Sequence, residues 1–577
     1  MKNKNISKDW LTHFEKSNQL ESPDYENTLK YFQKFADSTP FVNIKTIGVT
    51  PQGRELKVII VSKDKAFTPE LAKKTGKAIL LIQNGIHPGE VEGKDACMLL
   101  LREILITKEK QHLLDNTILL IIPVLNIDGH ERTSPFNRPN QNGPKKMGWR
   151  TNALNLNLNR DYLKADTPEI KSFLNLFNDW LPDFMIDNHT TNGADYQYHV
   201  TYGIETHQNI DRGLIGLIAK KYLPHLLNKV EHDGFIIGPY MEFKSGTIES
   251  GIVDLPAPPR LSHGYCAAQN RVCLLVETHS LKPFANRVFS TKSMMEHTIS
   301  FINENHKEII SLNKFADKQT VKNYLVDRKK FPLVLAGNGK FDKYLFKGFK
   351  WYDAYSEITG STVRKYTNNP MEIEIPIFNK ANSLKKTFVP AAYLIPPQFK
   401  DVIEVINAHH IKYNILKSNK PIKVEKYRFE NIRFAPRPYE GRQLPSFTCS
   451  SCHDTVDVEA GTLIVYTNQR ALRVIVNLLE PEAPDSFVNW GFFNAFFERK
   501  EYAEAYVMEP YSKQMMKDDP QLRSEFYKKV NEDESFKNNF GERLDFFYKR
   551  SPFYDKGENV YPILRIVNNK NQNTNLK

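Results

Sequence analysis

Four short runs of almost unbroken apolar residues constrain the fold of this 577-residue chain more than any other feature of its sequence. The runs occupy residues 78–82, 117–125, 184–187 and 272–276. Runs of this length are typical of strands that are buried on both faces of a parallel sheet. Helical patterns accompany them, for example at residues 24–36 and 168–180. The sequence therefore predicts an α/β fold with a mixed, mostly parallel sheet sandwiched by helices.

Three of the four runs are followed by polar side chains of types that occur in metal and catalytic sites. His87 and Glu90 follow the first run, His189 follows the third and Glu277 follows the fourth. In open α/β sheets, ligands bind beyond the carboxyl ends of the strands. A His-x-x-Glu pair is common by chance, but imidazole nitrogen and carboxylate oxygen are both zinc ligands. The position of all four side chains at strand ends therefore favours one shared site.

The ordered set His87-x-x-Glu90, arginines, His189 and Glu277 closely resembles the zinc metallocarboxypeptidases of the carboxypeptidase A type, over about residues 25–315. The resemblance implies that His87, Glu90 and His189 bind one Zn²⁺ per chain. It also implies that Glu277 is the catalytic carboxylate, which takes a proton from water and passes it to the leaving amine. Three protein ligands leave a fourth position for water.

The same resemblance suggests roles for residues after the loop at 130–147, which is rich in Asn, Pro and Gly. Arg150 resembles the arginine that helps to stabilise the oxyanion. Asn159 and Arg160 resemble the pair that binds the terminal carboxylate of the substrate, for which a guanidinium is well suited. A surface salt bridge is the alternative for each arginine taken alone.

The chain departs from the family pattern at two points. Members commonly have an Asp two residues before the Asn-Arg pair, as the partner of the first zinc histidine, whereas this chain has Asn157. Its amide oxygen can still accept from His87, but without a charge. The substrate-binding tyrosine is not assigned, since Tyr240 and Tyr265 are both candidates. We expect three further histidines near these segments to be structural: His199, His263 and His279.

The function that the resemblance implies is zinc-dependent hydrolysis of a peptide bond by a metal-activated water, at the C-terminal residue. Two alternatives stay open. One is a zinc amide hydrolase or endopeptidase that acts on cell-wall or other non-standard amides, because the residues that set specificity are unidentified. The other is a catalytically dead binding protein, against which the intact Glu277 argues.

The length of the chain predicts at least two domains. We expect a zinc carboxypeptidase-like catalytic domain at residues 1–315, ending in a helix at 290–313, and a charged linker at 314–330. Residues 331–577 would form a second, mixed α/β domain of unknown role, expected to shape or cover the cleft. Short apolar runs predict strands at residues 331–337, 371–378, 387–395, 422–434 and 461–466. A helical, aromatic-rich segment around residues 490–502 is predicted to pack in a core.

Composition narrows the partners. The net charge is +12, but the lysine pairs are scattered among acidic residues and no nucleic-acid-binding motif is present, so we expect no nucleic acid partner. The sequence contains no run of 18 or more apolar residues, so we expect no membrane span. The polar N-terminus resembles no signal peptide, which favours the cytoplasm by default, with export possible if a signal was trimmed.

The segment Cys449-Ser450-Ser451-Cys452-His453 matches the C-x-x-C-H motif of covalent haem attachment. We expect no haem, because the motif lies between strand-like segments and not in a helix. A redox-active pair or an incidental pair of surface cysteines is the preferred interpretation. Five cysteines are too few for a disulfide scaffold.

Overall fold

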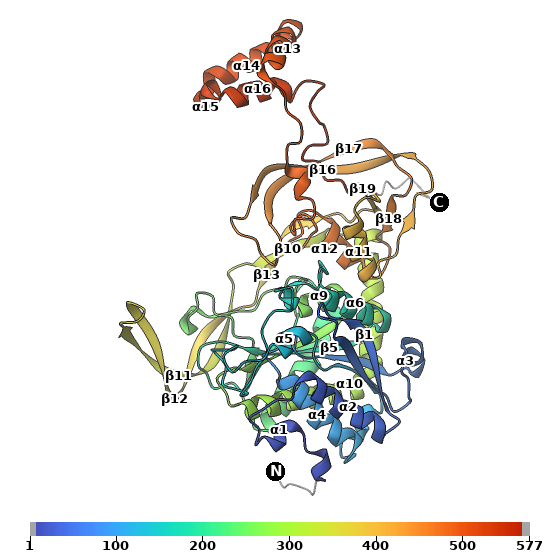
Figure 1. Ribbon diagram of the computed structural model, residues 1–577, viewed down its shortest axis with the longest axis vertical. Helices are drawn as coiled ribbons and strands as arrows, with labels where there is room; N and C mark the ends of the chain where they lie inside the picture. Colours follow the sequence, from blue (N-terminus) through green and yellow to red (C-terminus); the bar gives the residue numbers. More distant parts are fainter. Residues whose placement is uncertain (1–6, 568–577) are drawn as a thin grey trace.

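A computed structural model describes residues 7–567, so the outer ends of both predicted domains, residues 1–6 and 568–577, lie outside it. Its centre is an eight-stranded sheet in the order β1-β2-β4-β3-β5-β9-β6-β7 (Figure 1). The strands are β1 (Val42–Val49), β2 (Glu55–Val61), β3 (Ala78–Gln83), β4 (Thr117–Ile122), β5 (Phe184–Thr191), β6 (Val200–Gly203), β7 (Ile237–Pro239) and β9 (Val272–His279). The four predicted runs are the parallel neighbours β4, β3, β5 and β9. The predicted fold class is confirmed.

Helices cover both faces of this sheet. Successive side chains of a strand point to opposite faces, and Leu80 and Leu81 accordingly belong to two different core clusters. The face of Leu81 is covered by α6 (Pro168–Trp180) and α9 (Ser262–Ala268). The face of Leu80 is covered by α2 (Tyr25–Ser38), α4 (Glu92–Leu105), α8 (Leu223–His232) and α10 (Phe284–Val321).

The helix predicted at residues 290–313 is longer than expected. It runs as α10 from Phe284 to Val321 and continues as the π-helical turn η6 (Lys322–Val326). The expectation of a linker from residue 314 is therefore wrong as far as residue 326. The charges that suggested a linker lie on the solvent side of the helix, while Ala316 and Thr320 are buried.

The C-terminal half contains a six-stranded antiparallel sheet in the order β15-β18-β14-β19-β16-β17. Its strands are β14 (Ala392–Ile395), β15 (Asn414–Ile415), β16 (Lys420–Phe434), β17 (Pro445–Val458), β18 (Leu463–Tyr466) and β19 (Leu564–Ile566). Helices α11 (Lys400–Ala408) and α12 (Leu472–Leu479) pack beside it. Tyr393 and Val465 belong to the same core cluster as Leu81, so one apolar core joins the two sheets.

Two parts of the C-terminal half project from the rest (Figure 1). One is the hairpin of β11 (Asp342–Ser356) and β12 (Ser361–Phe378). The other is a group of helices with a small core of its own: α13 (Ala505–Asp518), α14 (Pro520–Glu532), α15 (Glu534–Asn538) and α16 (Phe540–Tyr548).

The aromatic segment before those helices packs in the core as predicted. Trp490 and Phe493 are buried, and Phe492, Phe496 and Phe497 pack against the shared core. The segment is not an α-helix, however, but a series of turns with one short 3-10 helix, η7 (Asn494–Phe497). Its rings are held by packing against other aromatic rings, which does not depend on a helical repeat.

The C-x-x-C-H segment lies within strand β17. Residues three apart on a strand point to opposite faces. Cys449 accordingly packs against the core while Cys452 is exposed. This arrangement does not bring the two thiols together for one shared group.

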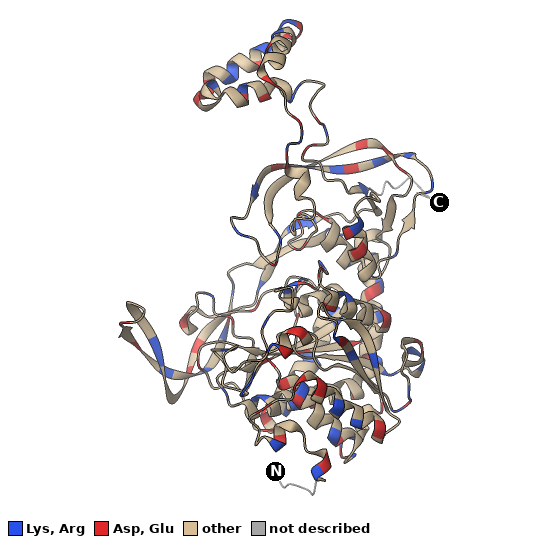
Figure 2. Cartoon of the chain, viewed as in Figure 1, with Lys and Arg blue, Asp and Glu red and all other residues tan. Residues whose placement is uncertain are grey.

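Charged side chains of both signs are interspersed over the elements of the chain (Figure 2). No helix among residues 7–567 is long and apolar enough to cross a membrane.

Candidate metal and active site

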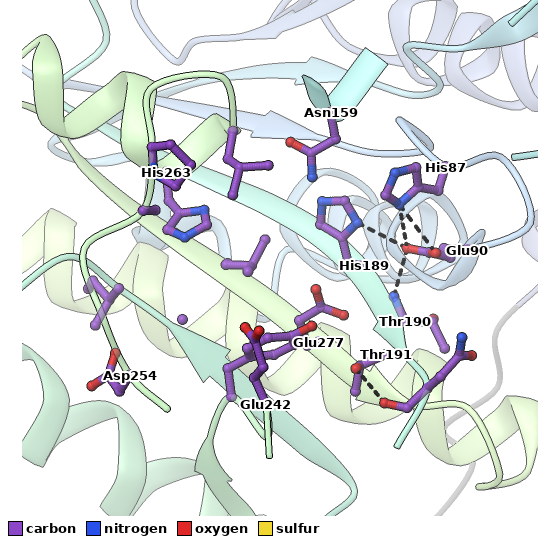
Figure 3. Close-up of a pocket in the computed structure, with 18 of the residues that line it drawn as sticks. His87, Glu90, Asn159, His189, Thr190, Thr191, Glu242, Asp254, His263 and Glu277 are labelled. Carbon is purple, nitrogen blue, oxygen red and sulfur yellow. Dashed lines mark hydrogen bonds and ion pairs between the residues drawn. The ribbon is translucent and has the colours of Figure 1, made fainter. Parts of the chain in front are cut away.

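Three predicted ligands meet at the carboxyl edge of the eight-stranded sheet (Figure 3). His87 and Glu90 lie in the loop between β3 and α4, and His189 lies in β5, the neighbour of β3. A carboxylate oxygen of Glu90 is 3.3 Å from His87 Nδ1 and 3.0 Å from His189 Nδ1. Their ligand atoms all lie within 4.8 Å of one another, and all three residues are buried. Among the described residues this is the one such group that could hold a metal ion.

The outer nitrogens of the two imidazoles have different partners. His87 Nε2 lies 3.0 Å from Asn157 Oδ1, as predicted. His189 Nε2 lies 2.9 Å from the carboxylate of Asp187. An imidazole that donates through Nε2 presents the lone pair of Nδ1 to a metal, and such partners fix the ring. One ring therefore has a neutral partner and the other a charged one.

Asp187 was missed by the sequence analysis, although a signal was present. The segment Asp187-Asn188-His189 lies at the end of a predicted strand, and residues two apart on a strand point to the same face. The carboxylate of Asp187 is fully buried. Burial opposes ionisation, yet the pKa of Asp187 is lowered because His189 and neighbouring hydrogen bonds stabilise its charge.

The Glu90 carboxylate is stabilised in its charged form. Burial raises its pKa, but the charges of His87 and Arg138 outweigh this effect and hold the pKa well below its usual range. Arg138 lies 2.9 Å from one carboxylate oxygen, and the backbone N–H of Thr190 donates to the other at 3.0 Å. Arg138 comes from the loop at 130–147, in which no site residue was predicted from the sequence.

Glu277 lies beside the ligands because of strand register. β5 and β9 are parallel, and their pairing aligns His189 with Glu277. The sequence placed both residues just after their strands. In the structure they lie within the strands, because the pairing continues to Thr191 and His279. Burial raises the pKa of Glu277 to about 8; His189 acts against this shift, and the negative charge of Glu90 adds to it.

A cavity of about 520 Å³ opens next to these residues and is lined by the other predicted site residues. Arg150, Asn159 and Arg160 all line it. Arg150 Nη1 lies 3.5 Å from Glu90, and its side chain is 43% exposed, so it retains freedom to reach a substrate. Asn159 Oδ1 accepts a hydrogen bond from the backbone of Ser262.

The structure separates the two tyrosine candidates. Tyr240 lines the cavity, and the nearby Glu277 carboxylate, together with burial, raises its pKa. Tyr265 lies in α9, is fully buried, and its hydroxyl forms a hydrogen bond with His409. Tyr240 is therefore the candidate that a substrate can reach.

Two of the three histidines expected to be structural are so. His199 Nδ1 accepts from the backbone N–H of Ile236, and the buried His279 ring stacks on Tyr196 at 4.0 Å. His263 instead lines the cavity, where burial lowers its pKa to about 4 and keeps it neutral. Three further carboxylates line the cavity: Glu205, Glu242 and Asp254.

The donor set fits a zinc ion. Two imidazole nitrogens and one carboxylate oxygen converge in a buried place, which is the ligand composition of a catalytic zinc site with one open position. A non-ligand carboxylate, Glu277, lies beside it. At the carboxyl edge of a mixed α/β sheet, these side chains form a candidate metal site of the class that metal-dependent hydrolases use.

Comparison with known proteins agrees with this class. Residues 28–202 match the model of the zinc carboxypeptidase family, so this part of the chain is similar to that family. The matched range contains the three candidate ligands, Arg150 and Asn159–Arg160, whereas Glu277 lies beyond it.

Several similar proteins are named carboxypeptidases. Carboxypeptidase 2 of Trichophyton rubrum is 20% identical over 497 residues, which cover 82% of this chain and 85% of that protein. Carboxypeptidase 2 of Trichophyton tonsurans is 20% identical over 460 residues, covering 76% and 78%. A solved metallo-carboxypeptidase from Pseudomonas aeruginosa is 15% identical and covers 49% of this chain and 69% of that one, with a TM-score of 0.36.

Proposed function

We propose that this chain is a zinc-dependent metallocarboxypeptidase that hydrolyses the last peptide bond of a peptide with a free C-terminus. The observation that carries the proposal is the alignment of Glu277 with the ligand His189 in neighbouring parallel strands. This register supports a proton-transferring carboxylate next to a His–Glu–His metal site. The catalytic unit that we propose extends over residues 1–315, followed by a second unit at 331–577.

His87, Glu90 and His189 would hold one Zn²⁺. Zinc in such a site lowers the pKa of a bound water to about 7 and polarises the carbonyl under attack. The fixed orientation of the two imidazoles by Asn157 and Asp187 supports this assignment.

Glu277 would accept the proton of the attacking water and deliver it to the leaving amine. A general base works best when its pKa lies near the working pH. The raised pKa of Glu277, about 8 in the metal-free protein, supports this role. A cation in the site would lower that value toward neutrality.

The arginines would bind the negative charges of the substrate. Arg150, which is partly exposed and lies next to the proposed ligands, would stabilise the developing oxyanion. Arg160 and Asn159 would bind the terminal carboxylate, since guanidinium and carboxylate form paired, charge-assisted hydrogen bonds.

The test compares peptides that differ only at the C-terminus. The zinc-loaded protein should cleave a free-carboxylate peptide and cleave its C-terminal amide far more slowly, with activity lost on chelation. Arg160→Lys should weaken cleavage of the acid about tenfold or more and leave the amide little changed, because lysine retains charge but loses the paired geometry. Equal cleavage of acid and amide would support the amide-hydrolase or endopeptidase alternative instead.

A further inference from the structure

The turn between β16 and β17 reaches from the C-terminal sheet to the candidate active site. Tyr439 and Arg442 exchange backbone hydrogen bonds of 2.9 and 3.0 Å, and Glu440 and Gly441 between them both have positive φ angles, 49° and 74°. Positive φ at both central residues is the mark of a tight type I′ turn. We call residues 439–442 the docking turn.

The docking turn contacts the loop that carries the proposed carboxylate-binding residues. The hydroxyl of Tyr439 accepts a hydrogen bond from Arg160 Nε at 3.0 Å. The carboxylate of Glu440 accepts from the backbone N–H of Asn157 at 2.8 Å. One turn, some 280 residues away in sequence, therefore touches both the proposed clamp and the residue that holds His87.

The docking turn is firmly anchored next to these contacts. Arg442 donates two hydrogen bonds, 2.8 and 2.5 Å, to the two carboxylate oxygens of Asp166. Asp166 follows the loop that carries Asn159 and Arg160. The ring of Tyr439 stacks on the buried Trp490 at 6.0 Å and 12°. Paired guanidinium–carboxylate bonds give geometric specificity as well as energy.

These contacts restrict the guanidinium of Arg160. Of its five N–H donors, Nε is directed to Tyr439 and one on Nη1 donates to the backbone carbonyl of Asn159 at 2.7 Å. The remaining donors lie on the end of the group, and Arg160 lines the cavity. An arginine that is already oriented loses less rotational freedom on binding a carboxylate.

We infer that the docking turn is a positioning element for recognition of the substrate's terminal carboxylate: Tyr439 orients Arg160, and Glu440 fixes the backbone at Asn157. The inference rests on the proposed function, because it assigns the clamp role to Arg160. It gives the C-terminal region a part in substrate binding.

The first experiment is Tyr439→Phe, which removes the hydroxyl and keeps the ring on Trp490. KM for a free-carboxylate peptide should rise about 3- to 10-fold, the range that one lost hydrogen bond allows, while kcat changes less than about twofold. Cleavage of the amide should not change. The matched control is Tyr527→Phe on α14, which should alter neither value. A purely structural role of Tyr439 would instead lower Tm and change both substrates alike.

A second variant acts at a distance. Arg442 contacts Asp166 and not Arg160. Arg442→Ala should free the docking turn and, like Tyr439→Phe, should raise KM for the free-carboxylate peptide.

Binding without turnover gives an independent readout. In a Glu277→Gln background, calorimetry should show weaker binding of a free-carboxylate dipeptide, and unchanged binding of its amide, once Tyr439→Phe is added.

The outcomes separate the two proposals. If the wild type does not prefer free carboxylates at all, the proposed function fails. If it prefers them and neither Tyr439→Phe nor Arg442→Ala reduces that preference or the binding of the acid, the positioning role is wrong and the proposed function stands.

Discussion

The eight-stranded sheet and the C-terminal antiparallel sheet contribute to the candidate site in opposite ways. In the first, β3 and β4 are six residues long and every residue is buried. In the second, β16 and β17 are 15 and 14 residues long, and more than half of their residues are not buried. Short parallel strands end together at one edge, so chemical groups gather there. Long antiparallel strands extend beyond their sheet and return, so the turn that joins β16 and β17 can reach Asn157 and Arg160.

Under the two proposals, the chemistry and the positioning of the substrate come from separate regions that share a core. The candidate ligands and Glu277 come from parallel strands and their adjoining loop, whereas the docking turn comes from the antiparallel hairpin. One apolar core cluster joins the two sheets and fixes their relative position. Variants in the two regions test this division between the parallel sheet edge and the docking turn.

The largest effect is expected at the parallel edge from Glu277→Gln. If the carboxylate carries the proton, kcat should fall roughly 10²- to 10⁴-fold for every peptide substrate, while the protein still binds one zinc. Kinetics and metal analysis on the same sample measure both quantities. Glu249→Gln, a surface ion-pair residue, is the matched control. Full activity of Glu277→Gln would remove the catalytic role from this edge.

Loss of a ligand should act on the metal and thereby on activity. His189→Ala removes one of three donors and should leave the protein with substoichiometric zinc and almost no turnover. Atomic absorption after dialysis measures the content. His112→Ala, an exposed histidine, should keep one zinc per chain. Full zinc occupancy in His189→Ala would show that the ligands lie elsewhere.

The stability of the metal-free protein should fall as pH rises through the range set by Glu277. Its pKa is raised from 4.5 to about 8 in the folded state, so the folded form holds the proton more tightly than the unfolded form. The stabilisation is complete below pH 4.5 and is lost as pH rises toward 8, by at most about 1.4 kcal/mol per unit.

Other buried groups titrate in the same range, so the informative quantity is a difference. Urea unfolding at pH 5, 6.5 and 8 should show a smaller decline in Glu277→Gln than in wild type. Identical slopes for the two proteins would mean that Glu277 is charged in the metal-free fold.

The different partners of the two histidines predict a smaller, asymmetric effect. Asp187→Asn should weaken zinc binding about 10- to 100-fold, the usual range for loss of such a partner. Asn157→Asp should strengthen it, because a charged acceptor then faces His87. Competition with a chelator of known affinity measures both variants. Weaker binding in Asn157→Asp would show that the neutral partner is needed.

The smallest effect is expected from removing the projecting helices. Phe496 and Asn559 are joined by a backbone hydrogen bond, so a short linker can replace residues 501–554. Because α13–α16 have their own core and stand apart from the site (Figure 1), kcat/KM should stay within about twofold of wild type. A larger loss would extend the active unit beyond the docking turn.

Much of the parallel half could be predicted from local sequence. Continuous apolar runs identified β3, β4, β5 and β9, because such strands are buried on both faces. The charged residues at 314–326 led to the wrong prediction of a linker, because an amphipathic helix and a linker can have similar composition. The burial of Ala316 and Thr320 distinguishes the two. Tyr240 and Tyr265 could not be separated, since exposure to a cavity is not encoded near either residue.

The sequence by itself determined the four parallel strands β4, β3, β5 and β9, the residue types of the candidate ligands and their order along the chain. It could do so because the hydrophobic pattern and the chemistry of His and Glu are properties of short segments. Only the tertiary structure decided which groups meet: the register that aligns His189 with Glu277, Asp187 behind His189, Arg138 on Glu90 and Tyr439 on Arg160. These contacts depend on how distant segments pack around a common core, and no local pattern specifies that arrangement.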